Sequence, residues 1–337
     1  VTAIRDDLLD ERSQYVKEGY TSFKIYMPFG DKRDDDDGLL KVLEQTATHG
    51  GLAFVHCEND AAVCHFTQGC LDSGETGPYG HLKSRPPMVE AEAAHRAIAL
   101  AEMVGAPVCI AHVTSKDTLA VIEAGRDRGA RVFGESCPQY LTLTDEHYQP
   151  WHGFEAAKFV CTPPLRDKPH LAALWTGLQR GSLHQVSSDH APFRFHDQKQ
   201  LGRNDFTRIP NGVPGIETRL PLVYSEGVAK ELISVSRFVE LVSANPAKLF
   251  GLYPQKGTLT IGADADLVVW DPGKKWEVTH EKLHHAVDYT PYEGMKLTGA
   301  PVLVLSRGEV VSENGESRAG RGRGQFVKRL PEVPAFL

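Results

Sequence analysis

The sequence predicts an α/β protein whose first part is a parallel sheet closed into a barrel and whose last part is a small antiparallel β domain. Apolar runs of strand length alternate with amphipathic helical patterns over residues 3–250, which is typical of parallel strands joined by crossover helices. Several of these runs end in ionisable residues, and in a barrel the carboxyl ends of all strands face one central mouth. From residue 256 the apolar period changes to two, which indicates short antiparallel strands.

The elements of the first part follow from periodicity and from their boundary residues. Gly19 is expected to end the first helix and Ser115 to cap a later one. The Gly- and Pro-rich stretch 57–87 is expected to be irregular, and 196–219 to be a polar loop. Strands are predicted at 20–27, 52–56, 107–112, 131–137 and 184–189, and helices at 3–18, 39–50, 89–104, 115–125, 171–179 and 236–250.

An open, doubly wound sheet is the alternative to the barrel. Such a sheet binds its ligand in a single crevice, usually with a glycine-rich phosphate loop. The sequence contains neither a Gly-x-Gly-x-x-Gly after a strand nor a P-loop, so the closed barrel is favoured.

The second part is predicted to begin near residue 253, which gives a barrel domain over 1–252 and a β-sandwich part with a C-terminal arm over 253–337. The arm contains Arg-Gly pairs at 318–325, and we expect it to lie on a neighbouring subunit rather than to bind RNA. Antiparallel strands are predicted at 257–262, 265–270, 300–306 and 309–311.

Composition limits the partners of the protein. The 337 residues are 41% hydrophobic, which suits a large core, and the net charge of −7 argues against nucleic acid as a partner. No apolar run is long enough to span a bilayer, so no membrane partner is expected. The six cysteines show no paired framework, which favours reduced thiols and a cytoplasmic location.

Four strand ends carry the residues that suggest chemistry: Lys24 within an apolar strand, and His56, His112 and Asp189 at the ends of three others. A lone buried lysine is ordinarily paired with an acid, and a lone histidine is ordinarily a hydrogen-bonded core residue. The shared position of all four at strand ends favours a metal site instead. Neutral imidazoles and a carboxylate are donors that suit zinc.

Lys24 adds an unusual possibility to this ligand set. Burial lowers the pKa of a lysine, and the neutral amine reacts with carbon dioxide to give a carbamate, a carboxylate able to bridge two metal ions. Two such ions would hold a bridging hydroxide that attacks a carbonyl, while Asp189 moves the proton to a leaving nitrogen. The sequence therefore predicts hydrolysis of an unactivated amide.

The chain resembles the dihydropyrimidinase and D-hydantoinase family of cyclic amidohydrolases, within the amidohydrolase superfamily. The resemblance covers essentially the whole chain. It is carried by segments 22–27 (Ser-Phe-Lys-Ile-Tyr-Met), 55–59 (Val-His-Cys-Glu-Asn), 111–115 (Ala-His-Val-Thr-Ser), 134–140 (Gly-Glu-Ser-Cys-Pro-Gln-Tyr), 162–166 (Thr-Pro-Pro-Leu-Arg), 188–192 (Ser-Asp-His-Ala-Pro), 201–206, 209–212, 245–250 and 287–295.

This resemblance implies a (β/α)8 TIM-type barrel with a small β-sandwich domain, assembled as a homotetramer. It implies two divalent ions, most simply Zn²⁺, bridged by carboxylated Lys24. His56 and His112 would be ligands of the second ion, and Asp189 a ligand and proton shuttle. Thr162 and Asn211 would hold the cyclic amide, largely through backbone groups.

The sequence departs from the family pattern at two places. The family's first strand supplies a His-x-His pair to one ion, and no His-x-His occurs in this sequence. Residue 1 is expected to fall before the fourth barrel strand, so this chain alone is not expected to be active. Phe29 stands at a substrate-binding position where the family usually has a tyrosine that stabilises the oxyanion, and losing one such donor elsewhere costs about 10²–10³ in rate.

The resemblance implies opening of a dihydropyrimidine or a 5-substituted hydantoin to its N-carbamoyl amino acid. Allantoinase or dihydroorotase activity is the alternative within the same class. A non-catalytic, dihydropyrimidinase-like scaffold protein is the alternative from another class. Segments 201–212 and 287–295 favour the first reading, and the presence of Lys24, His56, His112 and Asp189 argues against the scaffold.

Overall fold

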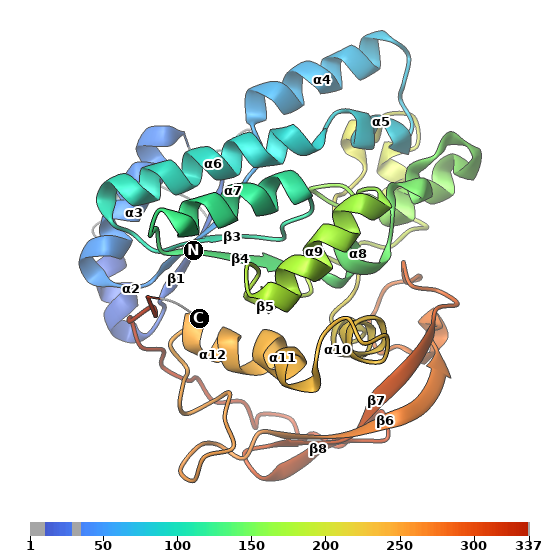
Figure 1. The fold of residues 1–337 in the computed structure, drawn as a ribbon. Coiled ribbons are helices and arrows are strands. Elements are labelled where there is room, and N and C mark those ends of the chain that lie inside the picture. Colours follow the sequence, from blue (N-terminus) through green and yellow to red (C-terminus); the bar gives the residue numbers. More distant parts are fainter. Residues whose placement is uncertain (1–10, 29–34, 336–337) are drawn as a thin grey trace.

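The computed structural model describes residues 11–28 and 35–335, which form a parallel sheet surrounded by helices and a separate antiparallel sheet (Figure 1). The parallel sheet has five strands in the order of the sequence: β1 (Ser22–Tyr26), β2 (Leu52–His56), β3 (Val108–Ile110), β4 (Val132–Ser136) and β5 (Gln185–Val186). Each strand pairs with the next in parallel, so the strand order never reverses. An open, doubly wound sheet needs such a reversal to form its ligand crevice.

The helices that connect these strands lie along the outside of the sheet (Figure 1). The predicted helices after the first strand are confirmed to within a few residues, apart from corrections given below. The α-helices of the described residues are α2 (Arg12–Glu18), α3 (Asp36–His49), α4 (Asp60–Asp72), α5 (Pro78–Lys83), α6 (Pro87–Val104), α7 (Lys116–Asp127), α8 (Pro138–Thr142), α9 (Lys168–Arg180), α10 (Arg219–Val223), α11 (Val235–Val239) and α12 (Asn245–Leu249).

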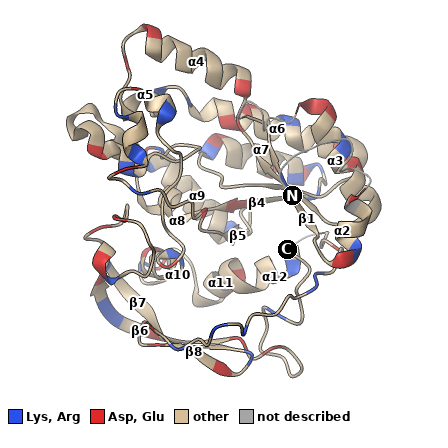
Figure 2. Cartoon of the chain, turned by 180° about the vertical axis from the view of Figure 1, so that it is seen from behind, with Lys and Arg blue, Asp and Glu red and all other residues tan. Residues whose placement is uncertain are grey.

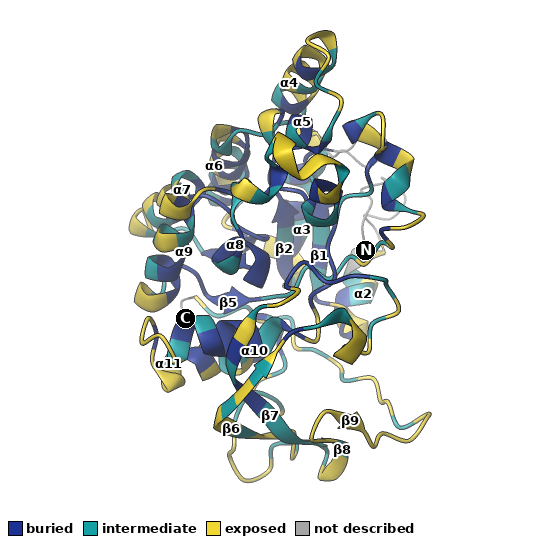
Figure 3. Cartoon of the chain, turned by 90° about the vertical axis from the view of Figure 1, so that its right-hand side faces the viewer, coloured by how far each residue is buried: buried dark blue, intermediate teal, exposed yellow. Residues whose placement is uncertain are grey.

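The strands are buried because helices cover one face of the sheet and inward side chains fill the other. All five residues of β4 are buried, and β2 is buried at four of its five positions. Figure 3 shows β2 as largely buried, whereas β1 alternates between buried and intermediate positions. Continuous apolar strands of this kind are the pattern expected of a parallel sheet covered on both sides.

Helix boundaries follow from local hydrogen bonds that the sequence indicated. Ser115 accepts a hydrogen bond from the backbone N–H of Thr118, which confirms it as the cap of α7. Gly19 ends α2 in the left-handed conformation, with φ of 97°. The predicted helix 236–250 is confirmed as α11 and α12 joined through a π-type segment, Glu240–Ala244.

The prediction that 57–87 is irregular is wrong. Asn59 caps α4 by accepting a hydrogen bond from Ala62, and Pro78 begins α5 at a position where proline is favourable. Only Val63 and Cys70 of α4 are buried, so the helix has a narrow apolar stripe. The apolar periodicity of α4 is weak for that reason. The glycines at 69, 74 and 77 are typical of an irregular stretch, so the sequence does not indicate the helix.

The antiparallel sheet comprises β6 (Leu267–Glu277), β7 (Lys296–Ser306), β8 (Glu309–Glu313) and β9 (Glu316–Ser317). It packs on the helical layer through Trp270, whose ring centroid lies 4.9 Å from that of Tyr224 and 5.9 Å from that of Phe238. The predicted strand 257–262 is wrong, because no described neighbour pairs with this segment, and Leu259 is 84% exposed. The domain division at residue 253 stays a prediction.

The C-terminal segment returns to the first strands of the parallel sheet. The backbone N–H of Gly51 donates to the carbonyl of Pro331 at 2.8 Å, and Arg329 donates to the hydroxyl of Ser22 at 3.0 Å. Gly251 has φ of 67°, and a Cβ there would lie 2.0 Å from the carbonyl oxygen of Leu330, so the close approach requires glycine. The predicted contact of the arm with a neighbouring subunit stays a prediction.

Charged residues of both signs are interspersed over the helices and loops (Figure 2). Five of the six cysteines are buried, Cys64 is exposed, and all six are free thiols. Within residues 11–28 and 35–335, none of the helices has the length and apolar character needed to cross a membrane.

His184, just before β5, makes the folding stability of the protein depend on pH. Its Nδ1 accepts a hydrogen bond from the backbone N–H of Gly134 at 3.1 Å, and the Arg126 guanidinium contacts the ring. Burial, followed by the charge of Arg126, lowers the pKa of His184 from 6.5 to about 3. The unfolded state therefore binds a proton that the folded state does not, so stability is lost as the pH falls below 6.5.

We expect His184→Asn to flatten this dependence, because the asparagine oxygen can accept the Gly134 hydrogen bond without titrating. The slope of unfolding free energy between pH 6.5 and 5 should decrease by up to about 1.4 kcal/mol per pH unit. Urea unfolding at a series of pH values measures it. His152→Asn, at an exposed position, is the control. Identical slopes for both variants and the parent protein would contradict the prediction.

Candidate active site

The parallel register brings the predicted strand-end residues to one edge of the sheet. In the β1–β2 ladder Tyr26 pairs with His56. Lys24 lies two residues before Tyr26 on β1, so their side chains lie on the same face of the sheet. His112 follows β3 by two residues, and Asp189 follows β5 by three. The rings of His56 and His112 are in edge contact, with centroids 4.5 Å apart and an interplanar angle of 71°.

Lys24 projects between aromatic faces rather than to solvent. Its Nζ lies 4.8 Å from the ring centroid of Phe54 and 5.3 Å from that of Tyr26. Burial lowers the pKa of Lys24, and the nearby acids Glu135 and Asp189 partly offset that effect. The positive charge of Lys24 also contributes to the lowered pKa of both His56 and His112, after burial itself. These mutual effects place Lys24 close to the other predicted site residues.

His56 is oriented by a carboxylate behind it. Its Nε2 lies 2.8 Å from Oε2 of Glu58, and both side chains are buried. Glu58 in turn lies 3.6 Å from Nε of Arg85. A hydrogen bond from Nε2–H to Glu58 leaves Nδ1 as the unprotonated nitrogen of the neutral ring, and histidine ligands of metals are commonly held in this way.

His112 and Asp189 both have left-handed backbone conformations, with φ of 36° and 44°. Such conformations are uncommon for residues other than glycine, and they cluster at functional sites. They turn both side chains sharply out of the strand direction at the strand ends. Nδ1 of His112 is buried and has no hydrogen-bond partner among the described residues, so it is a nitrogen left without a protein contact.

Glu135 on β4 is a buried acid that sequence reasoning missed. Burial raises its pKa to about 7, although Lys24 and hydrogen bonds from Ser187 and Gln185 oppose the shift. Nε2 of Gln185 donates to Glu135 at 2.8 Å. The signal that singled out Lys24, an ionisable residue inside an apolar strand, was equally present for Glu135. The end of that strand, at Cys137 and Pro138, carries no comparable ionisable residue.

Thr162 and Asn211 lie in two loops that are joined to each other. Gly212, next to Asn211, donates its N–H to the carbonyl of Val160 at 3.0 Å, two residues before Thr162. The hydroxyl oxygen of Thr162 and Oδ1 of Asn211 are both buried without a hydrogen-bond partner within the described part of the chain. The peptide bond between Thr162 and Pro163 is cis. Phe29 lies outside the described residues.

The residue types at this edge, histidine and aspartate, are ones that bind metal ions. A cluster of such residues does not by itself define a metal site. No group of three His, Cys, Asp or Glu residues within 11–28 and 35–335 is arranged to hold a metal ion. The unpartnered Nδ1 of His112, the oriented His56 and the carboxylate of Asp189 are suitable donors. These atoms are the nitrogen and oxygen donors that this edge of the sheet offers.

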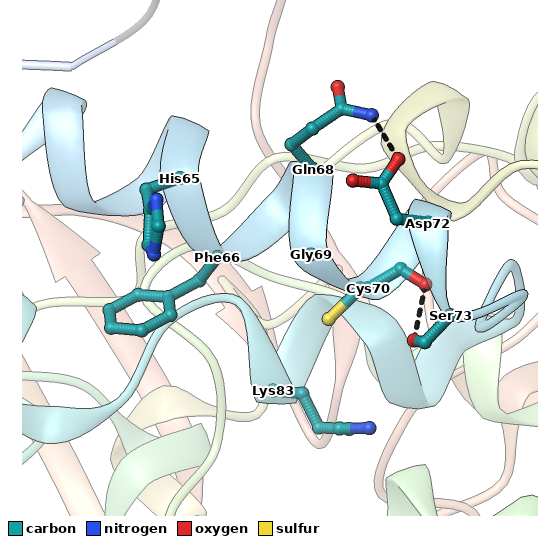
Figure 4. A pocket seen from close by; sticks show the side chains of 8 residues that line it. All are labelled: His65, Phe66, Gln68, Gly69, Cys70, Asp72, Ser73 and Lys83. Carbon is teal, nitrogen blue, oxygen red and sulfur yellow. Dashed lines mark hydrogen bonds between the residues drawn. The ribbon is translucent and has the colours of Figure 1, made fainter.

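A hollow lies away from the strand ends, between α4 and α5. It has a volume of about 350 Å³ and is lined by residues that include His65, Cys70 and Lys83 (Figure 4). Two hydrogen bonds are drawn there, from Gln68 to Asp72 and from Ser73 to the carbonyl of Cys70. None of the predicted site residues lines this hollow.

Residues 5–311 match the amidohydrolase family, and the chain belongs to it. The fold predicted from the sequence is confirmed by solved structures. Among them, the dihydropyrimidinase from Brevibacillus agri NCHU1002 superposes with a TM-score of 0.96 at 42% identity, over 99% of this chain and 73% of that one. The TIM-type barrel with a β-sandwich domain is therefore the fold class of this protein.

The relatives within the family are cyclic amidohydrolases. A D-hydantoinase from Geobacillus stearothermophilus is 45% identical over 98% of this chain and 70% of its own length. A D-phenylhydantoinase from Escherichia coli is 41% identical over 99% of this chain and 72% of its own. The L-hydantoinase from Arthrobacter aurescens has a TM-score of 0.88 at 33% identity, over 95% of this chain and 71% of that one. The predicted resemblance to dihydropyrimidinases and D-hydantoinases is thus confirmed.

We expect Glu58→Gln to weaken metal binding without unfolding the protein. The amide binds the His56 Nε2–H more weakly than the carboxylate does, so the ring loses part of its orientation. Loss of such an outer contact typically reduces metal affinity by about 10–100-fold. Chelator competition measures that affinity without any assay of turnover. Glu155→Gln, at an exposed glutamate, is the control, and equal affinities for the two variants would contradict this role of Glu58.

Proposed function

We propose that this protein hydrolyses a cyclic amide, a dihydropyrimidine or a 5-substituted hydantoin, to the corresponding N-carbamoyl amino acid. The observation that carries the proposal is the convergence of Lys24, His56, His112 and Asp189 at one edge of the parallel sheet. The names of the relatives support the substrate class. All are named as hydrolases of this type, so the non-catalytic scaffold is not favoured.

His56, His112, Asp189 and carboxylated Lys24 would hold two divalent ions, which we propose to be zinc. When bound, the ions polarise a carbonyl and make water nucleophilic at neutral pH. Neutral imidazoles are the form that binds a metal, and burial lowers the pKa of both histidines well below the usual value. Burial of Lys24 similarly favours the neutral amine, the form that reacts with carbon dioxide.

Asp189 would move the proton in this reaction. Water adds to the ring carbonyl, the bond from that carbon to the ring nitrogen breaks, and the nitrogen leaves with a proton. The carboxylate of Asp189 would accept the proton of the attacking water and deliver it to that nitrogen. Its position at a strand end supports this assignment. Burial raises the pKa of Asp189, and the positive charge of Lys24 opposes that shift.

Thr162 and Asn211 would hold the ring against Asp189. Their loops are joined through the Gly212 to Val160 hydrogen bond, and each has a buried polar atom without a protein partner. An amide ring presents one carbonyl and one N–H side by side, so it can satisfy backbone and side-chain groups of both loops. We further propose that the protein acts as a homotetramer, as the resemblance implies, and that it does so in the cytoplasm, as its unpaired cysteines favour.

The test is metal content together with turnover, measured on the protein expressed from its whole gene. We expect about two metal ions per chain and hydrolysis of dihydrouracil or a 5-substituted hydantoin. Lys24→Ala should lose at least one ion and nearly all turnover, because the substitution removes the amine that would form the bridging carbamate. Lys230→Ala, at an exposed turn position, is the matched control. A folded protein with neither metal nor turnover would refute the proposal.

A further inference from the structure

Lys199 is a completely buried lysine that has no role in the mechanism proposed above. It begins a short 3-10 turn, Lys199–Gly202, and its exposed fraction is 0%. Its Nζ donates to three backbone carbonyls, those of Val160 at 2.9 Å, Pro210 at 2.7 Å and Gly212 at 2.9 Å. An ammonium group has three N–H donors, so all of them are used.

The three carbonyls belong to the two loops that carry Thr162 and Asn211. Val160 lies two residues before Thr162, while Pro210 and Gly212 flank Asn211 on both sides. A single nitrogen therefore fixes the distance between the two loops at the point where each approaches the site. The Gly212 N–H also donates to the carbonyl of Val160, so the junction contains direct and lysine-mediated contacts.

The same junction reaches the strand end that carries Asp189. His190 forms an isolated parallel bridge with Val213, and the Ala191 N–H donates to the Val213 carbonyl at 3.1 Å. Gly212 has φ of 143°, and a Cβ there would lie 2.5 Å from that of Ala191. The segment after Asn211 is thus packed directly on the residues that follow Asp189.

Holding two loops together with a buried lysine costs free energy, and a purely stabilising role does not explain that cost. In the described part of the chain no carboxylate forms an ion pair with Lys199, and a buried cation without a counter-charge costs free energy. Burial lowers the pKa of Lys199 to about 7. The ammonium group holds three backbone carbonyls around one nitrogen atom, and it thereby fixes the positions of the two loops relative to each other.

We propose that Lys199 is a positioning residue for the cyclic amide: it sets the spacing of the Thr162 and Asn211 loops and their register against Asp189. The inference rests on the proposed function, since it gives these loops the ring as ligand. Lys199 touches neither the ring nor the proposed metal ligands, so it acts through the backbone of the two loops.

The experiment compares Lys199→Met with the parent protein, using the product of the whole gene. Methionine keeps much of the volume but leaves the carbonyls of Pro210 and Gly212 without their donor. We expect metal content to stay unchanged, KM for a 5-substituted hydantoin to rise at least about 10-fold, and kcat/KM to fall about 10²-fold, as for a small misplacement of substrate.

Lys230→Met is the matched control, and it should leave KM and kcat unchanged because Lys230 is exposed and pairs only with Glu226. Should Lys199→Met fail to fold, Lys199→Gln keeps two N–H donors on a shorter chain and should show a smaller rise in KM. A folded variant of either kind with the KM of the parent protein would overturn the inference, and lower thermal stability alone would not rescue it.

The outcomes also separate this inference from the function on which it rests. A parent protein that binds metal but turns over no cyclic amide refutes the proposed function, and the role of Lys199 towards that ring falls with it. A parent protein with turnover, joined to a Lys199 variant of unchanged KM, leaves the function standing and refutes only the positioning role.

Discussion

The parallel register of β1, β2 and β3 is the constraint on which the site depends. It places the carboxyl ends of these strands at one edge, and because side chains alternate along a strand, it also decides which residues face inward. A shift of one residue in the β1–β2 ladder would turn Lys24 to the helix side. A similar shift in the β2–β3 ladder would separate the rings of His56 and His112, whose contact spans those two strands.

Buried charges are tolerated at this edge because a layer of partners lies behind it. The carboxylate of Glu90 accepts the Thr114 N–H at 2.9 Å and lies 3.5 Å from Arg166, which also donates to the Thr114 hydroxyl at 2.9 Å. All three side chains are buried. Thr114 lies two residues after His112, so this network fixes the chain where it turns with a strained backbone.

Loops complete the site by a different principle from the strands. The strands are positioned by a repeating ladder, whereas the segments around Thr162 and Asn211 have no ladder of their own. Their backbone groups are satisfied by specific partners, chiefly Lys199 and the Gly212 to Val160 hydrogen bond. Backbone polar groups away from water require such partners, so a loop that approaches a buried site must recruit side chains to hold it.

The sequence by itself determined the alternation of strands and helices, the helix boundaries at Gly19 and Ser115, and the strand-end positions of Lys24, His56, His112 and Asp189. These features are local, because periodicity, capping and strand termination are read from neighbouring residues. It failed for α4, whose apolar stripe is narrow, and for 257–262, whose alternation is not matched by a pairing strand among the described residues. Only the tertiary structure decided that Glu58 orients His56, that Glu135 lies beside Lys24, and that Lys199 joins two loops. Those contacts depend on which strands and loops become neighbours in space, and one chain's local pattern carries no record of that pairing.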